Sequence, residues 1–330
     1  MSPFLRRFIA AVILLGLFAP AAFAATFKIA TAVPDGTTWM KEMRAGAKEI
    51  GERTGGRVKF KFYPGGVMGN DKSVMKKIRL GQLQGGALTG GSMSLIFPEM
   101  QIYDLPMLFR SYAEIDHVRS KIDPLLKEGL AGNGFVCLGI SEGGFVYLMS
   151  SEPVRSIEDL KSHKVWMPEG DRLTEALFKR MGVPPIPLSL ADVYTGLQTG
   201  LIDTVESIPT GALAFQWHTR IGAVTEVPLS YLVGGLVVEK KRFEKLKPED
   251  QKVVREVMDR IFARMDDINR ADNEKAMAAL GKQGIQFVKP SPAEVERWKG
   301  LAEETIKASA ANIVNSEIYR KMLKMLEEKR

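Results

Sequence analysis

The chain contains a single cysteine and three histidines among its 330 residues, which limits the chemistry open to it. Cys137 lies in the apolar run FVCLGI, so it can form no internal disulfide, and a buried, inert thiol is the favoured interpretation. The histidines, His117, His163 and His218, lie far apart and form no HExxH or other paired spacing. A histidine metal site and a cysteine nucleophile therefore have little support, and we predict neither a metal nor a cofactor.

The sequence also lacks the short motifs that mark common enzymes and nucleic-acid binders. It contains no GxSxG elbow, no GxxxxGK[ST] phosphate loop and no GxGxxG turn, and the segment GGSMS at 90–94 departs from the elbow pattern. Lysines and arginines are interspersed with acidic residues, so the net charge of +7 indicates a solvated surface rather than a basic stripe. An exported enzyme stays an alternative hypothesis, although no set of nucleophile and base supports it.

Long hydrophobic runs are confined to the beginning of the chain. Arg6 and Arg7 precede an apolar stretch that ends at Phe18, and the tripeptide AFA then fits a small-residue cleavage site, so residues 1–24 are predicted to be a secretory signal peptide. A membrane anchor is disfavoured because the apolar stretch is short and Pro20 follows it. We therefore expect a soluble, exported protein, and export without disulfides is typical of a bacterial periplasm.

The remaining chain, about 306 residues long, exceeds what one compact core usually holds, so two domains are expected. In residues 160–209, strand-like runs at 165–167 and 202–205 alternate with helical patterns that Gly182 and Gly200 end. Further strands are expected at 27–31, 57–63, 135–140, 145–150, 224–227 and 232–238, and further helices at 37–53, 71–80, 112–130 and from 292 onward. This β-α-β order predicts an α/β fold with a mainly parallel sheet.

One helical pattern is much longer than the others. Apolar residues recur at helical spacing from Pro248 to about Leu280 without a breaker. A helix of roughly 33 residues rises about 50 Å, which is longer than one domain needs. It could therefore brace two lobes.

The ends of the predicted strands are the first places to look for a site. In open α/β sheets, ligands bind beyond the carboxyl ends of strands, which here means residues 166–170 and 206–209. The stretch GGALTGGS at 85–92 follows another strand, and the backbone N–H groups of Gly90 and Gly91 could face an anionic ligand. Equally, these glycines could serve only a tight turn.

Five segments carry a family resemblance in their order and spacing. They are KFYPGGVMGNDKSVMKKIRLGQLQGGALTGGSM, IFPEMQIYDLPMLFRSYAE, SEPVRSIEDLKSHKVWMP, PLSLADVYTGLQTGLIDTVESIP and LKPEDQKVV. They resemble the DctP-type solute-binding proteins of tripartite ATP-independent periplasmic (TRAP) transporters over nearly all of the mature chain. The DVYTGLQTGLID and IYDLPMLF segments are the specific ones.

The resemblance implies a two-lobed periplasmic binding protein fold of the α/β class, with crossing hinge strands and a long helix spanning both lobes. We place lobe I at 25–143 and 232–271, and lobe II, with the C-terminal helices, at 144–231 and 272–330. The resemblance also implies no catalysis. It implies a receptor that closes on a small solute, usually an organic acid, and delivers it to a permease of small DctQ-type and large DctM-type membrane subunits.

We further expect the hinge to bend at the strands near 143–147 and 228–236, where Gly234 and Gly235 allow backbone adjustment. No partner nucleic acid is expected, and the protein is expected to be a monomer or a weak dimer.

The sequence departs from this family at the position that most concerns the solute. Relatives normally carry arginine in a K-[IVL]-R-[VM]-P motif, where the guanidinium pairs with the solute carboxylate. Here the segment is KVWMP, with Trp166 at the arginine position. A second arginine of some relatives falls on or near Val146, and their frequent asparagine before proline corresponds to Ser207. The carboxylate clamp therefore does not carry over.

Two hypotheses remain for the solute: it is neutral, aromatic or amide-like and stacks on the indole, or Arg172 or the glycine loop supplies the missing donors. Each candidate also has a structural alternative, namely core for Trp166, a helix cap for Glu206 and a solvated charge for Arg172. We expect only one of Phe145 and Tyr147 to face the cleft, and Tyr147 is favoured for its hydroxyl. The predicted ligand-binding residues are Trp166, Tyr147, Phe145, Thr89, Gly90, Gly91, Ser92, Glu206, Ser207 and Arg172.

Overall fold

The structure is a computed structural model, and it describes residues 24–309 and 311–330. The predicted signal peptide, apart from Ala24, lies outside the described residues. None of the helices in these ranges is long and apolar enough to cross a bilayer.

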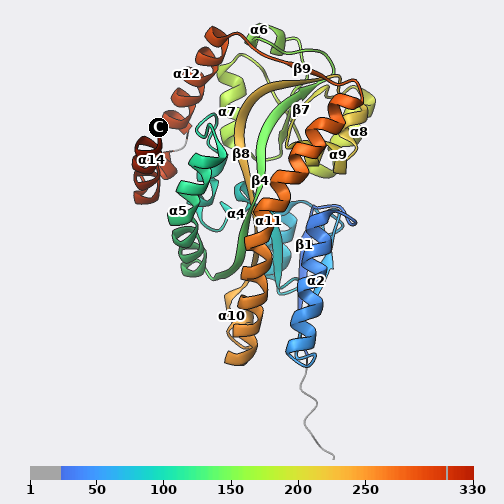
Figure 1. Cartoon of the computed structure of the whole chain (residues 1–330), viewed down its shortest axis with the longest axis vertical. Coiled ribbons are helices and arrows are strands. Elements are labelled where there is room, and N and C mark those ends of the chain that lie inside the picture. Colours follow the sequence, from blue (N-terminus) through green and yellow to red (C-terminus); the bar gives the residue numbers. More distant parts are fainter. Residues whose placement is uncertain (1–23, 310) are drawn as a thin grey trace, which may run out of the picture.

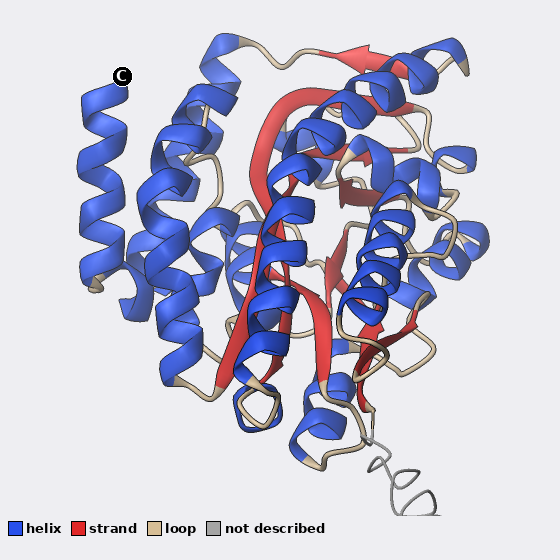
Figure 2. Ribbon diagram, turned by 60° about the horizontal axis from the view of Figure 1, so that its bottom comes forward, coloured by secondary structure: helices blue, strands red, loops and turns tan. Residues whose placement is uncertain are grey.

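A seven-stranded sheet runs through the molecule in the order β2-β1-β3-β8-β4-β7, with β9 beside β8 (Figures 1 and 2). Strands β2, β1 and β3 pair in parallel, but the pairs β3–β8, β8–β4 and β4–β7 are antiparallel. The prediction of a mainly parallel sheet is thus wrong for its centre, because the chain crosses the molecule along β4 and returns along β8. The strands are β1 (Ala25–Thr31), β2 (Val58–Tyr63), β3 (Gly85–Thr89), β4 (Phe135–Ser150), β7 (Thr204–Ser207), β8 (Ala223–Glu239) and β9 (Gln286–Val288), besides the separate parallel pair β5 (Trp166–Pro168) and β6 (Ile186–Leu188).

The two crossing strands are continuous, whereas the sequence predicted each of them as two shorter strands. β4 has 16 residues and β8 has 17, and they pair along almost their whole length. The ladder is irregular between Glu142 and Gly144, and Gly144 has a φ of 118°. That conformation favours glycine, and the extra residue breaks the alternation that strand prediction depends on.

Both halves of the sheet are covered by helices on both faces (Figure 2). In the first lobe, α5 (Tyr112–Gly132) packs on one face and α2 (Thr38–Arg53) on the other. In the second lobe, α7 (Arg172–Arg180) covers one face and α8 (Val193–Thr199) and α9 (Pro209–Ala214) the other. The two lobes therefore have separate cores joined by one sheet.

Helix α11 (Pro248–Lys282, 35 residues) confirms the predicted long helix and spans both lobes (Figure 1). Val257, Ile261 and Phe262 lie in the core of the first lobe, and Leu280 lies in that of the second. Phe262 lies so close to β4 that a Cβ on Gly139 would be only 2.1 Å from its ring. The Phe262 ring thus packs directly on the backbone of the crossing strand.

Several local predictions hold with small shifts. Asp171 is the N-cap of α7, and Gly200 ends α8 in the left-handed region with a φ of 69°. Helix α3 (Asp71–Arg79) begins at the residue that the sequence predicted, and Asn70 caps it by accepting from the Ser73 N–H. The other short helices are α4 (Gly90–Met93), α6 (Ile157–Leu160), α10 (Lys240–Phe243) and α13 (Ala311–Val314), with 3-10 turns η1 (Pro98–Asp104), η2 (Leu190–Asp192) and η3 (Trp217–Thr219).

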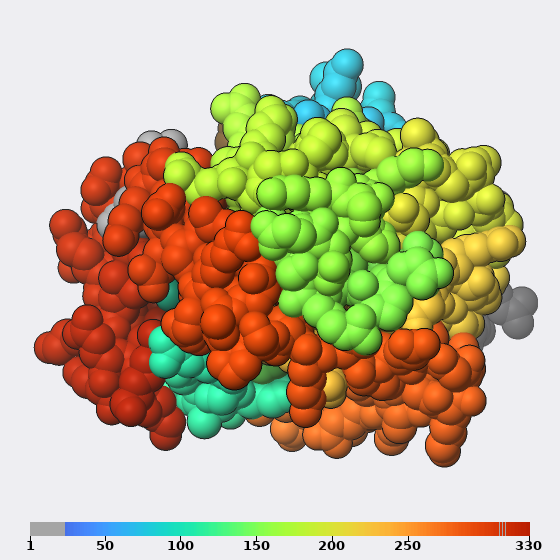
Figure 3. Space-filling view, turned by 90° about the horizontal axis from the view of Figure 1, so that it is seen from above, coloured from blue at the N-terminus to red at the C-terminus, as the bar shows by residue number. Residues whose placement is uncertain are grey.

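The C-terminal helices lie along one side of the molecule, as the red segment in Figure 3 shows. Helix α12 (Pro292–Ser309) packs against α7 of the second lobe, and α14 (Glu317–Lys329) packs against α5 of the first. Arg330 pairs with Glu114 of α5 at 2.9 Å. The end of the chain therefore contacts both lobes.

Candidate functional site between the lobes

The glycine loop between β3 and α4 is held by its own side chains. Thr89 caps α4 by accepting from the Ser92 N–H at 3.3 Å, and its hydroxyl donates to the Ser92 Oγ at 3.0 Å. The Ser92 hydroxyl in turn donates to Asp71 at the start of α3. The loop predicted from the sequence is thus placed at a strand end, and both of its hydroxyl protons are used inside the first lobe.

Asp104, at the end of η1, lies directly against this loop. Its Oδ2 is 3.3 Å from where a Cβ on Gly90 would lie, and 3.4 Å from a Cβ on Gly91. Burial, and then the neighbouring Asp171, raise the pKa of Asp104 well above its usual range, against a backbone hydrogen bond from Gly91 that favours the charged form. The glycines therefore allow the close approach of a carboxyl group of this chain.

Two further carboxyl groups face this region from the second lobe. The Asp171 side chain accepts from the backbone N–H groups of Leu173 and Thr174, both at 3.1 Å, at the start of α7. Glu206, on β7, is partly buried, and burial together with Asp171 raises its pKa to about 8. Asp171 thus acts on Asp104 across the lobes and on Glu206 within its own lobe.

The lobes touch near these carboxyl groups. The Asn70 amide of the first lobe donates to Glu169 of the second at 3.2 Å. Lys72 of α3 reaches over Gly170, with its Nζ 3.1 Å from the position of a Cβ there. The start of α3 and the loop that follows β5 therefore meet across the boundary between the lobes.

Trp166 lies in the core of the second lobe and is only 4% exposed. Its indole N–H donates to the Leu188 carbonyl oxygen at 3.1 Å, and its ring meets that of Trp217 edge-on, 5.4 Å between centroids. It shares this core with Val205, whereas the next residue, Glu206, points to the opposite face of β7. The structure therefore does not bring Trp166 and Glu206 to one point.

The two aromatic candidates on β4 occupy different surroundings. Phe145 is buried among Tyr112 and Tyr231, with centroids 5.1 and 5.0 Å away. Tyr147 is partly buried between the cores of the two lobes, and burial raises the pKa of its hydroxyl. Of the two side chains, only that of Tyr147 thus remains partly exposed.

The remaining candidates differ in accessibility. The Ser207 hydroxyl donates to the carbonyl oxygen of Ile208 at 3.0 Å. Arg172 is exposed and lines a cavity of about 250 Å³ between the lobes, together with Ser94, Pro98 and Gln101. Arg172 therefore keeps its charge in contact with solvent at the edge of the interlobe space.

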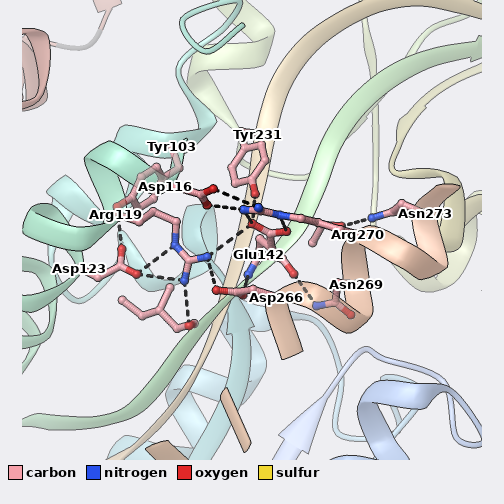
Figure 4. Close-up of polar contacts among 12 residues, drawn as sticks. Tyr103, Asp116, Arg119, Asp123, Glu142, Tyr231, Asp266, Asn269, Arg270 and Asn273 are labelled. Atoms are coloured by element: carbon pink, nitrogen blue, oxygen red, sulfur yellow. Dashed lines mark hydrogen bonds and ion pairs between the residues drawn. The ribbon is translucent and has the colours of Figure 1, made fainter. Parts of the chain in front are cut away.

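A buried polar network fixes the crossing of β4 and α11 (Figure 4). Glu142 on β4 is 1% exposed, and Arg270 of α11 donates to its two oxygens at 2.6 and 2.8 Å. The Tyr231 hydroxyl also donates to Glu142, and Arg119 of α5 lies 3.6 Å away. Burial, and then Glu142, raise the pKa of Tyr231. The sequence analysis did not identify this network, whose members are far apart in the chain.

One face of α11 holds the irregular part of β4. Asp266 accepts from the Glu142 N–H at 2.9 Å, Asn269 donates to the Glu142 carbonyl at 2.6 Å, and Asn273 donates to that of Gly143 at 2.6 Å. Asn273 also accepts from the N–H of Thr210 in the second lobe at 3.1 Å. Residues spaced by three or four on a helix share a face, so α11 satisfies the backbone groups that the irregular ladder leaves free.

Among the residues around the glycine loop, the sequence analysis overlooked Asp104 and the role of Asp71 as the acceptor for the Ser92 hydroxyl. Asp104 lies within the segment IYDLPMLF, which was recognised as specific, and its acidic side chain in an otherwise apolar run was the available signal. The part of the chain that the structure describes has no group of three or more His, Cys, Asp or Glu side chains placed to hold a metal ion.

Comparisons with known proteins agree with this architecture. The family model described as bacterial extracellular solute-binding protein, family 7 (DctP) matches residues 29–312. The chain is 29% identical over 217 residues to the uncharacterized protein YiiZ of Salmonella typhimurium, a match that spans 63% of this chain and 64% of that protein. It is 27% identical over 242 residues to the 2,3-diketo-L-gulonate-binding periplasmic protein YiaO of Escherichia coli, covering 72% of this chain and 73% of that one.

Among solved structures, the sugar acid binding protein DctPAm of Advenella mimigardefordensis, in complex with galactonate, superposes with a TM-score of 0.85 at 19% identity. That similarity covers 93% of this chain and 99% of the other, and it concerns the fold. Proteins of the matched family are solute-binding receptors and not enzymes. The chain therefore belongs to the DctP family of TRAP periplasmic solute-binding proteins.

Proposed function

We propose that this protein is a periplasmic receptor that captures a small organic solute between its lobes. The observation that carries the proposal is the pair of long strands, β4 and β8, which joins two separately packed lobes whose strand ends face each other. Such a connection lets the lobes rotate toward each other around a bound solute. The names of two similar proteins state 2,3-diketo-L-gulonate and galactonate as ligands, and others state a C4-dicarboxylate or succinate, which supports a small organic solute.

We propose that lobe I comprises 25–143 and 232–271 and that lobe II comprises 144–231 and 272–330. The hinge would bend at 143–147 and 228–236. The irregular pairing around Gly144 supports this location, because a bulge interrupts the hydrogen bonds between the two strands and bends the bulged strand.

We propose that the solute contacts the loop at Thr89, Gly90, Gly91 and Ser92 from the first lobe. From the second lobe it would contact Glu206, Ser207 and Arg172, and from the crossing strand Tyr147, with Phe145 behind it. Trp166 would form a wall of the cleft through the area of its ring, because its N–H is already donated to Leu188.

Delivery is the remaining step of the proposal. Residues 1–24 would direct export to the periplasm, and the loaded receptor would dock transiently on DctQ-type and DctM-type membrane subunits. Membership of the TRAP family supports both partners.

The test combines ligand screening with a measurement of shape. The mature protein is screened by thermal unfolding against organic acids, amides, sugars, aromatic solutes and amines, since a ligand at 100-fold its dissociation constant stabilises by about 2.7 kcal/mol. Small-angle scattering with the stabilising ligand should show a smaller radius of gyration. An unchanged radius at saturation would contradict closure of the two lobes.

A further inference from the structure

The side-chain hydrogen bonds of helix α11 pass from the first lobe to the second at Asn273. Just before it, Asp272 accepts from the Thr38 hydroxyl of α2 at 2.9 Å, and one turn earlier Asn269 donates to the Glu142 carbonyl oxygen at 2.6 Å. The Asn273 oxygen instead accepts from Thr210 of the second lobe, from its N–H at 3.1 Å and from its hydroxyl at 2.9 Å. Asn273 is therefore the point at which this helix bonds to the other lobe.

Helix α9 depends on Asn273 for a hydrogen-bond acceptor at its start. The first N–H groups of a helix have no partner within the helix, and a polar residue at the N-cap usually supplies one. Here the N-cap is Ile208, whose apolar side chain can accept nothing, and Pro209 has no N–H. The Asn273 oxygen takes the place of the cap for Thr210, so α11 holds the segment that directly follows β7.

The nitrogen of the same amide holds the irregular part of β4. It donates to the Gly143 carbonyl oxygen at 2.6 Å, and it lies 2.6 Å from the position that a Cβ on Gly144 would take. Glycine at position 144 therefore serves both the φ of 118° and the close approach of the amide. Asn273 is only 6% exposed, so water competes little for these bonds.

We propose that Asn273 is a positioning residue for lobe closure, because its one amide ties the start of α9 to the strand at Gly143 where the hinge is proposed to bend. This inference rests on the proposed receptor function and concerns how the lobes are held rather than which solute they bind. An apolar side chain of similar size makes neither bond, and a carboxylate can only accept. Loss of either bond should loosen the second lobe relative to the first.

The distance between the lobes in the free protein tests this role. Spin labels are attached through Lys76→Cys on α3 and Lys179→Cys on α7, both at exposed positions, while the buried Cys137 stays in place. Double electron–electron resonance then gives the distribution of the distance between the labels without any solute. We expect Asn273→Leu to make this distribution about twofold broader than in the protein with Asn273.

The matched control is Asn269→Leu, one turn away on the same helix. It removes a bond of the same length to the neighbouring carbonyl of β4, but it leaves the contact with Thr210 in place. The control should keep the original width, although both variants lose a buried hydrogen bond and should unfold at a lower temperature. Equal broadening in both variants would show a general loosening of α11 from β4, and an unchanged width for Asn273→Leu would show a purely structural residue. Either result would overturn the proposal.

The variant Asn273→Asp separates the two bonds and carries the test alone if Asn273→Leu does not fold. Its carboxylate can accept from Thr210 but cannot donate to Gly143, so the distribution should be broad at about pH 8. Once protonated, the carboxyl group again has a donor and an acceptor, so the original width should return near pH 4, with the protein that retains Asn273 measured at both pH values as control. An unchanged width at pH 8 would reduce Asn273 to a cap for α9 and overturn the proposal.

These measurements are independent of the test of the receptor function. They use the free protein, so their outcome decides the role of Asn273 whether or not any compound of the ligand screen binds. A screen without a ligand would count against the receptor function alone.

Discussion

The crossing of β4 and α11 and the proposed cleft both contain partly or fully buried carboxyl groups, but the surroundings of these groups differ. At the crossing, Glu142 is surrounded by Arg270, Arg119 and Tyr231. In the cleft, Asp104 and Glu206 have no cationic partner among the described residues, and their pKa values are raised. A fully compensated charge fixes a structure, whereas an uncompensated one costs stability that a ligand can restore. The difference separates a carboxyl group that the protein neutralises from two that, within the described chain, it leaves without a cationic partner.

The largest effect on stability is expected when Glu142, the carboxyl group with arginine partners, is removed. Glu142→Ala leaves two arginines without their shared partner in the interior, so it should lower the free energy of unfolding by about 3–5 kcal/mol. Urea denaturation measures this. The control is Asp116→Asn, which removes the exposed partner of the same Arg270, at 58% side-chain exposure, and should cost below about 1 kcal/mol. Equal effects of the two changes would contradict the comparison.

Trp166 tests whether the wall of the cleft is also core. Trp166→Ala removes a buried ring that contacts Trp217 and should lower the free energy of unfolding by about 3 kcal/mol, at the low end of the usual range for a deleted aromatic ring. Trp166→Phe, which loses mainly the hydrogen bond to Leu188, should cost about 1–2 kcal/mol. If the ring also borders the solute, Trp166→Ala weakens binding as well, which calorimetry measures. A stability change below about 1 kcal/mol for Trp166→Ala would place the ring outside the core.

The raised pKa of Glu206, which has no cationic partner in the part of the chain that the structure describes, can be tested by the pH dependence of stability. Its pKa is about 8 in the folded protein and near 4.5 when unfolded, so between these values the folded state binds more protons and stability falls as the pH rises. The fall should amount to about 3 kcal/mol between pH 5 and pH 8, with a slope of at most about 1.36 kcal/mol per pH unit. Because other groups also titrate, the readout is the difference between the wild type and Glu206→Gln. Parallel curves for the two proteins would show that Glu206 has an ordinary pKa.

The smallest expected effect concerns the contact between the lobes. Glu169→Ala removes the hydrogen bond from Asn70 and should change the free energy of unfolding by less than about 1 kcal/mol, because the pair is exposed. The same change should speed solute dissociation a few-fold, since the contact exists only when the lobes meet. Stopped-flow displacement measures the rate, with Glu175→Ala, an exposed residue of α7, as control. If Glu175→Ala releases the solute as fast as Glu169→Ala does, the Asn70–Glu169 contact plays no part in holding the lobes closed.

Much of the fold was readable from periodicity, and the exceptions have physical causes. The helix at Pro248–Lys282 was predicted nearly to its ends, because its apolar spacing is regular and no breaker interrupts it. Strand β4 was divided in two because Gly143 and Gly144 interrupt its alternation locally, while its partners there are residues of β8 about 90 positions away. Long-range pairing of that kind leaves no local signal in the sequence.

The candidate site shows a similar limit. The loop at Gly90 and Gly91 was located from its position after a strand. That the Asp104 carboxyl group lies against this loop depends on how η1 packs beside it, which the local sequence does not show. The three residues of β5 could not reveal which face of that strand meets the cleft, so the pocket and core interpretations of Trp166 stayed open. Asp104 becomes informative only once the structure places it against Gly90 and Gly91.

Helix α11 has a consequence for how the receptor can move. It contacts both lobes and binds β4 at Glu142 and Gly143. We therefore expect the length of this helix to stay constant when the lobes rotate about the proposed hinge. Spin labels near Lys252 and Lys282 should therefore keep one separation whether or not solute is present, while labels on α3 and α7 should approach each other. A membrane partner that binds this helix would therefore distinguish the loaded from the free receptor only by the orientation of the two lobes relative to the helix.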